Sequence, residues 1–224
     1  MKAARPRAVV FDLDGTLLDS LPLVLQAFAH ALQPFTESPT MEIFARLGGP
    51  PARVFSNLLG GDTHVPAALE RLTLFNRDNG HRIRPFEGVA RWLGELRGKA
   101  LELAVWTGRD RGTTLTLLRE HGLEDFFSHV ICGDDLPTHK PDPQGLNAIL
   151  ERLGVPPKEA LLIGDADVDV HGGAACGVDT VLIRNGRAIE ADVEALAWRI
   201  VSSPSEAFEV VLDRIAAHGD TDDG

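Results

Sequence analysis

Five short apolar runs, each bounded by turn-forming residues, constrain the fold of this chain more than any other feature. They lie at residues 8–11, 101–106, 129–132, 160–163 and 178–183. Runs of this length without polar interruption are typical of strands buried on both faces. Helical patterns at 113–120, 143–153 and 168–176 alternate with the later runs. This alternation predicts an α/β fold, a Rossmann-like parallel sheet with helices on both faces.

The long interval between the first and second runs predicts an inserted module. Residues 12–100 are far more than a crossover between parallel strands needs. Helix-like segments at 22–32, 41–47, 51–59 and 66–78 are separated by proline- and glycine-containing breaks. We therefore expect a small all-helical module at residues 17–85, hinged near 17–19 and 84–87. Residues 1–16 and 86–224 would form the core.

The last part of the chain shows weaker patterns. Residues 186–196 give no clear element, whereas 198–201 are expected to form an edge strand and 204–216 a closing helix. The tail at 218–224 is expected to be disordered.

Composition restricts the partners that this chain can have. The 224 residues carry a formal net charge of -11, which would repel a nucleic-acid backbone. No apolar stretch reaches the roughly 20 residues that span a bilayer, and no signal-peptide pattern precedes the first run. Cys132 and Cys176 lack metal or redox spacing and are expected to be structural. We expect a cytoplasmic protein, either a monomer or a homodimer, without nucleic-acid or membrane partners.

The first apolar run ends in two carboxylates, Asp12 and Asp14, which are separated by Leu13 and followed by Gly15. In an extended strand Leu13 would face the opposite side, so the two carboxylates can converge on one spot. Neighbouring carboxylates are poorly tolerated unless a cation lies between them. A cation-assisted site at the carboxyl end of this strand is indicated. The alternative is that both residues only cap a helix or occupy a turn.

Two further segments carry groups suited to binding a phosphoryl group. Thr107 and Gly108 follow the second run, where a hydroxyl and a close backbone N–H can donate to phosphoryl oxygens. Lys140 precedes Pro141 near a helix start, and its ammonium would stabilise negative charge in a transition state.

The fourth run leads into an acidic segment that contains Asp165, Asp167 and Asp169. Mg²⁺ prefers oxygen ligands, keeps several waters and needs only one or two protein carboxylates beside a substrate phosphate. Asp12 and Asp165 meet this requirement. Asp169 is expected to support the metal shell, with Lys140 as a candidate partner.

Taken in order, these four segments resemble the four motifs of the haloacid dehalogenase-like hydrolases. The opening from Asp14 to Ser20, the helical insertion and the Gly49-to-Pro51 loop are most similar to the phosphoglycolate phosphatase-like branch. The resemblance implies a Mg²⁺-dependent phosphatase that hydrolyses a phosphate monoester of a small metabolite through an aspartyl phosphate. Ala166 and Asp167 depart from the residues usual in the family, which leaves their effect on the metal shell open.

The resemblance also implies a role for each site residue. Asp12 would be the nucleophile and Asp14 the general acid and base. The phosphoryl group would be held by Thr107, Gly108 and Lys140. The metal would be held by Asp12, Asp165, Asp169 and the backbone carbonyl of Asp14.

The helical module would, by the same resemblance, be a cap that closes over the site. Arg46 and Arg53 flank the Gly48-to-Pro51 loop and would contact a second anionic group of the substrate. Alternatively, both are solvated surface charges. Two other functions stay open, namely a sugar-phosphate mutase of the same fold and a catalytically silent member that binds a partner.

Overall fold

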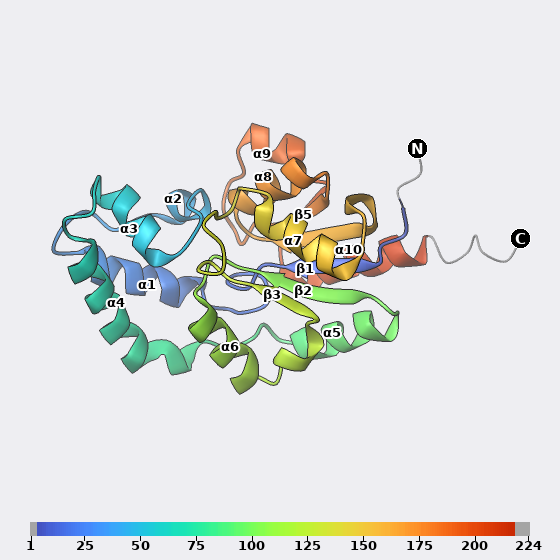
Figure 1. The fold of residues 1–224 in the computed structure, drawn as a ribbon, viewed down its shortest axis with the longest axis horizontal. Helices are drawn as coiled ribbons and strands as arrows, with labels where there is room; N and C mark the ends of the chain where they lie inside the picture. The colour runs from blue at the N-terminus through green and yellow to red at the C-terminus, as the bar shows by residue number, and fades with distance from the viewer. Residues whose placement is uncertain (1–3, 218–224) are drawn as a thin grey trace, which may run out of the picture.

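The computed structural model, which describes residues 4–217, contains a six-stranded parallel sheet (Figure 1). Its strands are β1 (Ala8–Phe11), β2 (Glu102–Trp106), β3 (His129–Ile131), β4 (Ala160–Gly164), β5 (Asp179–Ile183) and β6 (Arg199–Val201). The strand order is β3-β2-β1-β4-β5-β6, and each neighbouring pair is parallel. The chain therefore moves outward from β1 in both directions, which leaves a crevice at the carboxyl ends of the central strands.

Alternate side chains of the strands face two helical layers. Val9 and Phe11 pack with the layer made by α5 (Val89–Gly98), α6 (Arg111–Glu120) and α10 (Pro204–Ala216). Ala8 and Val10 face α7 (Gln144–Leu153). The helices α8 (Asp167–Cys176) and α9 (Ala191–Leu196) cover Leu182 on that same side. Both faces of the sheet are thus buried, as the uninterrupted apolar runs predict.

A second group of helices lies beside the carboxyl edge of the sheet, at the left in Figure 1. It consists of α1 (Leu21–Leu32), α2 (Met41–Ala45), α3 (Pro51–Leu59), α4 (Val65–Asn79) and the short 3-10 helix η1 (Gly80–Arg82). These helices enclose their own hydrophobic cluster, in which Phe28 packs edge-on against Phe44 and Phe55. The two connections to the sheet meet at Leu18, which bridges both Asp14 and Pro85. We call this group the cap.

The predicted fold class is confirmed, and three local features differ from or extend the sequence expectation. Helix α5 lies in a segment to which no element was assigned, and α9 occupies part of the unassigned stretch. Two further 3-10 helices, η2 (Glu124–Phe126) and η3 (Pro157–Glu159), precede β3 and β4. Within residues 4–217, no helix is both long and apolar enough to cross a membrane. The tail expected to be disordered lies outside the described residues, and the boundaries 17 and 85 stay a prediction.

Candidate active site

The carboxyl edge of the sheet brings three acidic side chains together. Asp12 directly follows β1, Asp165 directly follows the adjacent β4, and Asp169 lies in the first turn of α8. All three are buried, and one carboxylate oxygen of each lies within 4.8 Å of the others. A buried set of three carboxylates is expensive unless positive charge enters it. The donor set consists of oxygen atoms only, which fits Mg²⁺.

Lys140 supplies part of that positive charge. Its ammonium Nζ donates to Asp12 Oδ1 and to Asp169 Oδ1, each at 2.6 Å, and lies 5.0 Å from the centre of the Trp106 ring. Burial would lower the pKa of Lys140, but the two carboxylates outweigh it and raise the pKa above its ordinary range. Lys140 is therefore charged at neutral pH.

The negative charge that Lys140 does not neutralise adds to the effect of burial on the pKa values of the carboxylates. Burial raises the pKa of Asp12 to about 7, with Lys140 acting in the opposite direction and Asp169 adding to the rise. Burial also raises the pKa of Asp165 well above its usual range, reinforced by Asp12 and Asp169. One ammonium cannot neutralise three carboxylates, and a divalent cation would restore the balance. The structure thus provides a site whose electrostatics and donor atoms fit the predicted metal.

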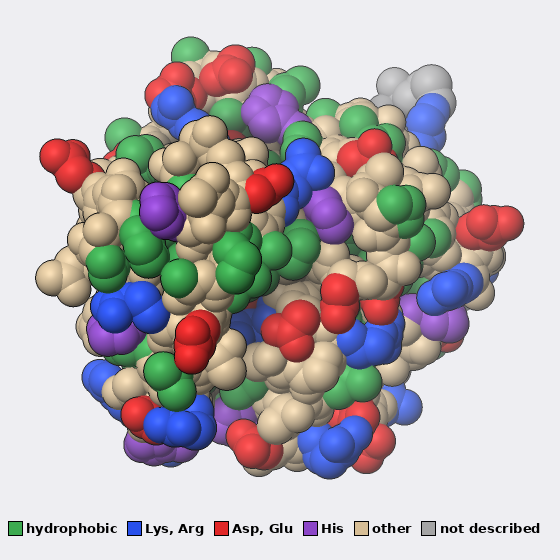
Figure 2. Space-filling view, turned by 60° about the vertical axis from the view of Figure 1, so that its left-hand side comes forward, with side chains coloured by type: hydrophobic (Ala, Val, Ile, Leu, Met, Phe, Trp, Pro, Cys, Tyr) green, Lys and Arg blue, Asp and Glu red, His purple; other side chains and the backbone are tan. Residues whose placement is uncertain are grey.

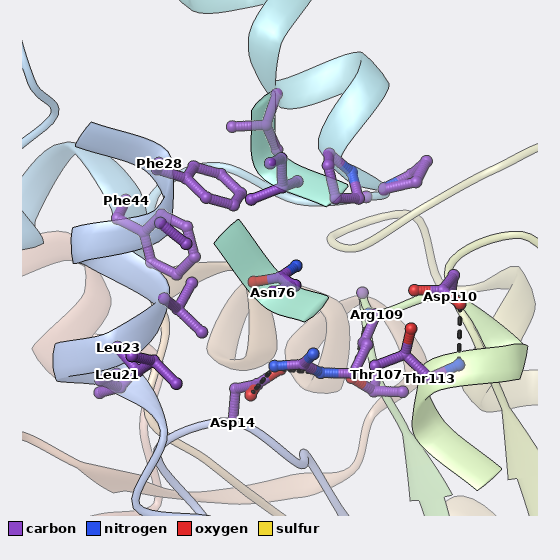
Figure 3. A pocket seen from close by; sticks show the side chains of 18 of the residues that line it. Asp14, Leu21, Leu23, Phe28, Phe44, Asn76, Thr107, Arg109, Asp110 and Thr113 are labelled. Atoms are coloured by element: carbon purple, nitrogen blue, oxygen red, sulfur yellow. Dashed lines mark hydrogen bonds and ion pairs between the residues drawn. The ribbon is translucent and has the colours of Figure 1, made fainter. Parts of the chain in front are cut away.

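Asp14 lies beside this cluster but is held by a different cation (Figure 3). Arg109 donates through Nε to Asp14 Oδ2 at 3.0 Å and through Nη2 to Asp14 Oδ1 at 2.6 Å. Ser20 Oγ also donates to Asp14 Oδ1, at 2.5 Å. Burial favours the neutral acid, but these donors outweigh it and lower the pKa of Asp14. In this arrangement Asp14 is an ionised carboxylate with a fixed orientation.

Thr107 and Gly108 follow β2, next to β1 in the sheet, so they face the same edge. Thr107 is buried, and its Oγ1 accepts a hydrogen bond from the backbone N–H of Arg109 at 3.2 Å. Gly108 faces the cap, because a methyl group added to it would lie 3.3 Å from the carbonyl oxygen of Gly49. The structure thus places both residues at the cavity that contains Asp12.

The two cap arginines take up different positions. Arg46 forms an ion pair with Glu190 and reaches to 3.9 Å from Asp167. Arg53 lies beside His139; burial, followed by the Arg53 charge, lowers the pKa of His139. Neither arginine is among the described residues that line the cavity. Their expected contact with substrate remains a prediction.

Asp167, the departure from the family pattern, has a cationic partner of its own. Arg187 Nη2 lies 2.6 Å from Asp167 Oδ1 and also donates to the backbone oxygen of Asp165 at 2.9 Å. Asn185 Nδ2 donates to the backbone oxygen of Gly15 at 3.0 Å. The additional carboxylate is therefore neutralised outside the acidic cluster, and Arg187 supports the loop that carries Asp165.

Three residues that contact the site received no role in the sequence analysis, namely Arg109, Asn185 and Arg187. Arg109 directly follows the Thr107-Gly108 pair, and that adjacency is the only signal that could have singled it out. Asn185 and Arg187 lie in the segment after β5, which showed no recognisable pattern.

The cluster opens into a cavity of about 910 Å³ between the cap and the sheet edge. Asp12, Asp14, Thr107, Lys140 and Asp165 line its floor. Side chains of the cap helices and of α6, among them Thr113, line much of the rest (Figure 3). The arrangement provides buried carboxylates, fixed cations and a cation-attracting cluster at one end of a half-open cavity.

A sheet of this order, a cap inserted after β1 and an aspartate cluster at the carboxyl edge define a class of hydrolase. The chain matches the family model described as haloacid dehalogenase-like hydrolase over residues 9–183, and it belongs to that family.

Individual relatives agree with this assignment. The chain is 35% identical over 207 residues to the phosphoglycolate phosphatase of Rhodospirillum rubrum, covering 86% of each chain. It is 31% identical over 225 residues to the N-acetylmuramic acid 6-phosphate phosphatase of Pseudomonas aeruginosa, covering 96% of this chain and 98% of that one. A solved putative haloacid dehalogenase-like hydrolase from Bacteroides fragilis is 26% identical, with a TM-score of 0.79 over 91% of this chain and 100% of that one. The prediction that the chain is a phosphatase of this family is confirmed.

Proposed function

We propose that the protein hydrolyses a small phosphate monoester with Asp12 as the nucleophile and Mg²⁺ as the cofactor. One observation carries this proposal: Asp12 lies at the floor of the cavity between the cap and the sheet edge, held by Lys140 beside Asp165 and Asp169. A carboxylate fixed in this way is suited to attack on phosphorus. The phosphatase names of the relatives support the same reaction.

In the first step Asp12 attacks phosphorus, and the bond from phosphorus to the ester oxygen breaks. The leaving alcohol takes a proton from Asp14, so that an aspartyl phosphate and a free alcohol result. In the second step water attacks the aspartyl phosphate while Asp14 accepts its proton. Inorganic phosphate leaves and Asp12 is regenerated. Thr107, Gly108 and Lys140 would hold the phosphoryl oxygens during both steps.

The contacts of Asp14 add a requirement to this sequence. Both of its oxygens are engaged by Arg109, and Ser20 donates to one of them. Proton donation requires a neutral Asp14, so the carboxyl must exchange Arg109 for the ester oxygen of the substrate. The guanidinium of Arg109 would then be free to bind a phosphoryl oxygen.

Asp12, Asp165 and the backbone carbonyl of Asp14 would hold the metal, and Asp169 would position Lys140. Bound Mg²⁺ would supply positive charge to the phosphoryl oxygens and to the clustered carboxylates. The cap, taken as residues 17–85, would exclude water from the cavity. We also propose that the substrate is a small phosphorylated metabolite and that the protein acts in the cytoplasm.

Phosphate release from a panel of monoesters, phosphoglycolate and sugar phosphates included, tests the proposal. We expect turnover with Mg²⁺ and none with a chelator. Asp12→Asn should lower the rate by at least about a thousandfold. Asp19→Asn is the matched control, because Asp19 lies in the same segment but is exposed. Equal activity of Asp12→Asn and the wild type would contradict covalent catalysis by Asp12.

The two alternatives give different results in the same assay. A sugar-phosphate mutase would convert its substrate without net phosphate release and would require a diphosphorylated sugar. A silent binding member would release no phosphate from any ester, with or without Mg²⁺.

A further inference from the structure

The cavity continues from the catalytic floor into the interior of the cap, and this inner part is largely apolar. Leu21, Leu23 and Phe28 of α1 line it, together with Phe44 of α2 (Figure 3). On α4, the lining residues recur at helical spacing, so one face of the helix is directed toward the cavity. They are Leu69, Leu72, Thr73, Asn76 and Arg77.

The charges around this inner part do not favour a second anionic group. Of the described cationic side chains that line the cavity, Lys140 and Arg109 bind catalytic carboxylates. Arg77 is 68% exposed and forms an ion pair with Asp78. Arg46 and Arg53 lie outside the lining. A substrate carboxylate placed among the leucine and phenylalanine side chains would lose its hydration without gaining a partner there.

The size of the cavity also exceeds what a very small leaving group would fill. Its volume of about 910 Å³ would hold about 30 water molecules at the volume that each occupies in the liquid. The two-carbon acid of phosphoglycolate would leave most of this space to water in contact with apolar side chains. A larger apolar group would displace that water and gain free energy of binding.

From the volume, the lining and the position of the cations, we propose that the preferred substrate is a phosphate monoester of a bulky, largely apolar alcohol. The phosphoryl group lies at Asp12, and the alkyl or aryl part extends into the cap against Phe28, Phe44 and Leu72. The proposal rests on the phosphatase function proposed above and narrows its substrate class. Asn76, whose side chain lies in the middle of the view in Figure 3, offers one polar contact to the leaving group.

A series of straight-chain alkyl phosphates, from methyl to octyl, tests this proposal alongside phosphoglycolate. With Mg²⁺ present, we expect kcat/KM to rise about fourfold for each added methylene, until the cavity is filled. The kcat/KM for hexyl phosphate should exceed that for phosphoglycolate. Two results would rule out an apolar leaving group while the phosphatase function stands. One is a kcat/KM that does not depend on chain length, and the other is a higher kcat/KM for phosphoglycolate than for hexyl phosphate. If none of these esters releases phosphate, both proposals fail.

Two neighbouring positions on α4 provide a matched pair of variants. Thr73 lines the cavity, whereas Leu74 is 44% exposed and is not among the lining residues. Thr73→Trp should reduce the ratio of kcat/KM for hexyl over methyl phosphate by at least about tenfold. Leu74→Trp should leave that ratio unchanged.

A second filling variant, Asn76→Trp, provides an independent test if Thr73→Trp does not fold. Asn76 is exposed, as Thr73 is, and lies one helical turn further along the same face. If a folded variant at either lining position keeps the wild-type ratio, the leaving group does not enter the cap, and the proposal is wrong.

Discussion

The ion pair between Asp14 and Arg109 is a residue-scale contact with a large expected effect on stability. Both side chains are mostly buried, with 19% and 12% of their surface exposed. Removing one partner leaves the other charge buried without compensation. Arg109 also lies close enough to the acidic cluster for its charge to act on Asp12.

We therefore expect Arg109→Met to lower the free energy of unfolding by about 3 kcal/mol in metal-free buffer. Adding Asp14→Asn should restore part of this loss, because no unpaired carboxylate then remains. Urea unfolding of the two single variants and the double variant measures this coupling. Arg119→Met is the control, since Arg119 is 66% exposed in its pair with Glu124 and should cost no more than about 1 kcal/mol. Strictly additive losses for Asp14 and Arg109 would show that the pair is not coupled.

The cysteines give a prediction about pH. Burial raises the pKa of Cys132 to about 11, and burial also raises that of Cys176 to about 11. The reactive thiolate is therefore present in about one molecule in a thousand at pH 8, against about a quarter in an unfolded chain. Alkylation by iodoacetamide should be at least about a hundredfold slower in the native protein than in urea, and should accelerate as the pH rises toward 11. Rapid alkylation of the native protein at pH 8 would contradict this.

At the scale of elements, the contact between the cap loop and the core depends on Gly48. A methyl group on Gly48 would lie 1.9 Å from the backbone oxygen of Lys140, and this atom has no freedom to move aside without displacing Lys140. The loop between α2 and α3 can approach Lys140 this closely only because Gly48 has no side chain.

Gly48→Ala should therefore hold the cap away from the sheet edge and lower kcat/KM by about a hundredfold, since small displacements of a closed site have effects of this size. Steady-state kinetics with the best ester of the panel measures the change. Gly98→Ala at the end of α5 is the control, because no atom lies within 4 Å of the added methyl group. Wild-type kinetics in Gly48→Ala would mean that the loop contact does not take part in turnover.

The sequence predicted those elements whose signal is local. The buried strands were predicted because each apolar run can be recognised without knowing which strands lie beside it. Asp12, Thr107 and Asp165 directly follow three of these strands. Helix α5 was not predicted because its apolar pattern is short and is interrupted by glycines. The apolar residues are Val89, Leu93 and Leu96, and the glycines in and beside them are Gly88, Gly94 and Gly98. Its stability comes from packing against the sheet rather than from helix propensity.

Contacts between residues far apart in sequence could not be predicted, because they depend on how the strands pair. Arg109 and Asp14 are 95 positions apart in sequence, and only the parallel pairing of β1 with β2 makes them neighbours. Arg187 reaches Asp165 and Asp167 because β4 and β5 pair in the same way. The sequence identified the groups that follow the strands but not the partners that fix their orientation.

At the scale of the whole molecule, we expect the acidic cluster to couple metal binding to stability. Asp12, Asp165 and Asp169 converge from β1, β4 and α8, so the folded chain assembles a site that the unfolded chain lacks. A ligand that binds only the folded state stabilises it by mass action.

At a Mg²⁺ concentration about a hundred times its Kd, binding should add about 2.7 kcal/mol to the free energy of unfolding. For a chain of this size, Tm should then rise by roughly 5–10 °C. Differential scanning fluorimetry, first with Mg²⁺ and then with a chelator, measures this rise. Asp165→Asn should abolish the rise, whereas Asp192→Asn, an exposed position on α9, should retain it. Without metal, Asp165→Asn should have a higher Tm than the wild type, because burial raises the pKa of Asp165 and its charge therefore opposes folding at neutral pH. A full Mg²⁺-dependent rise in Asp165→Asn would place the metal elsewhere.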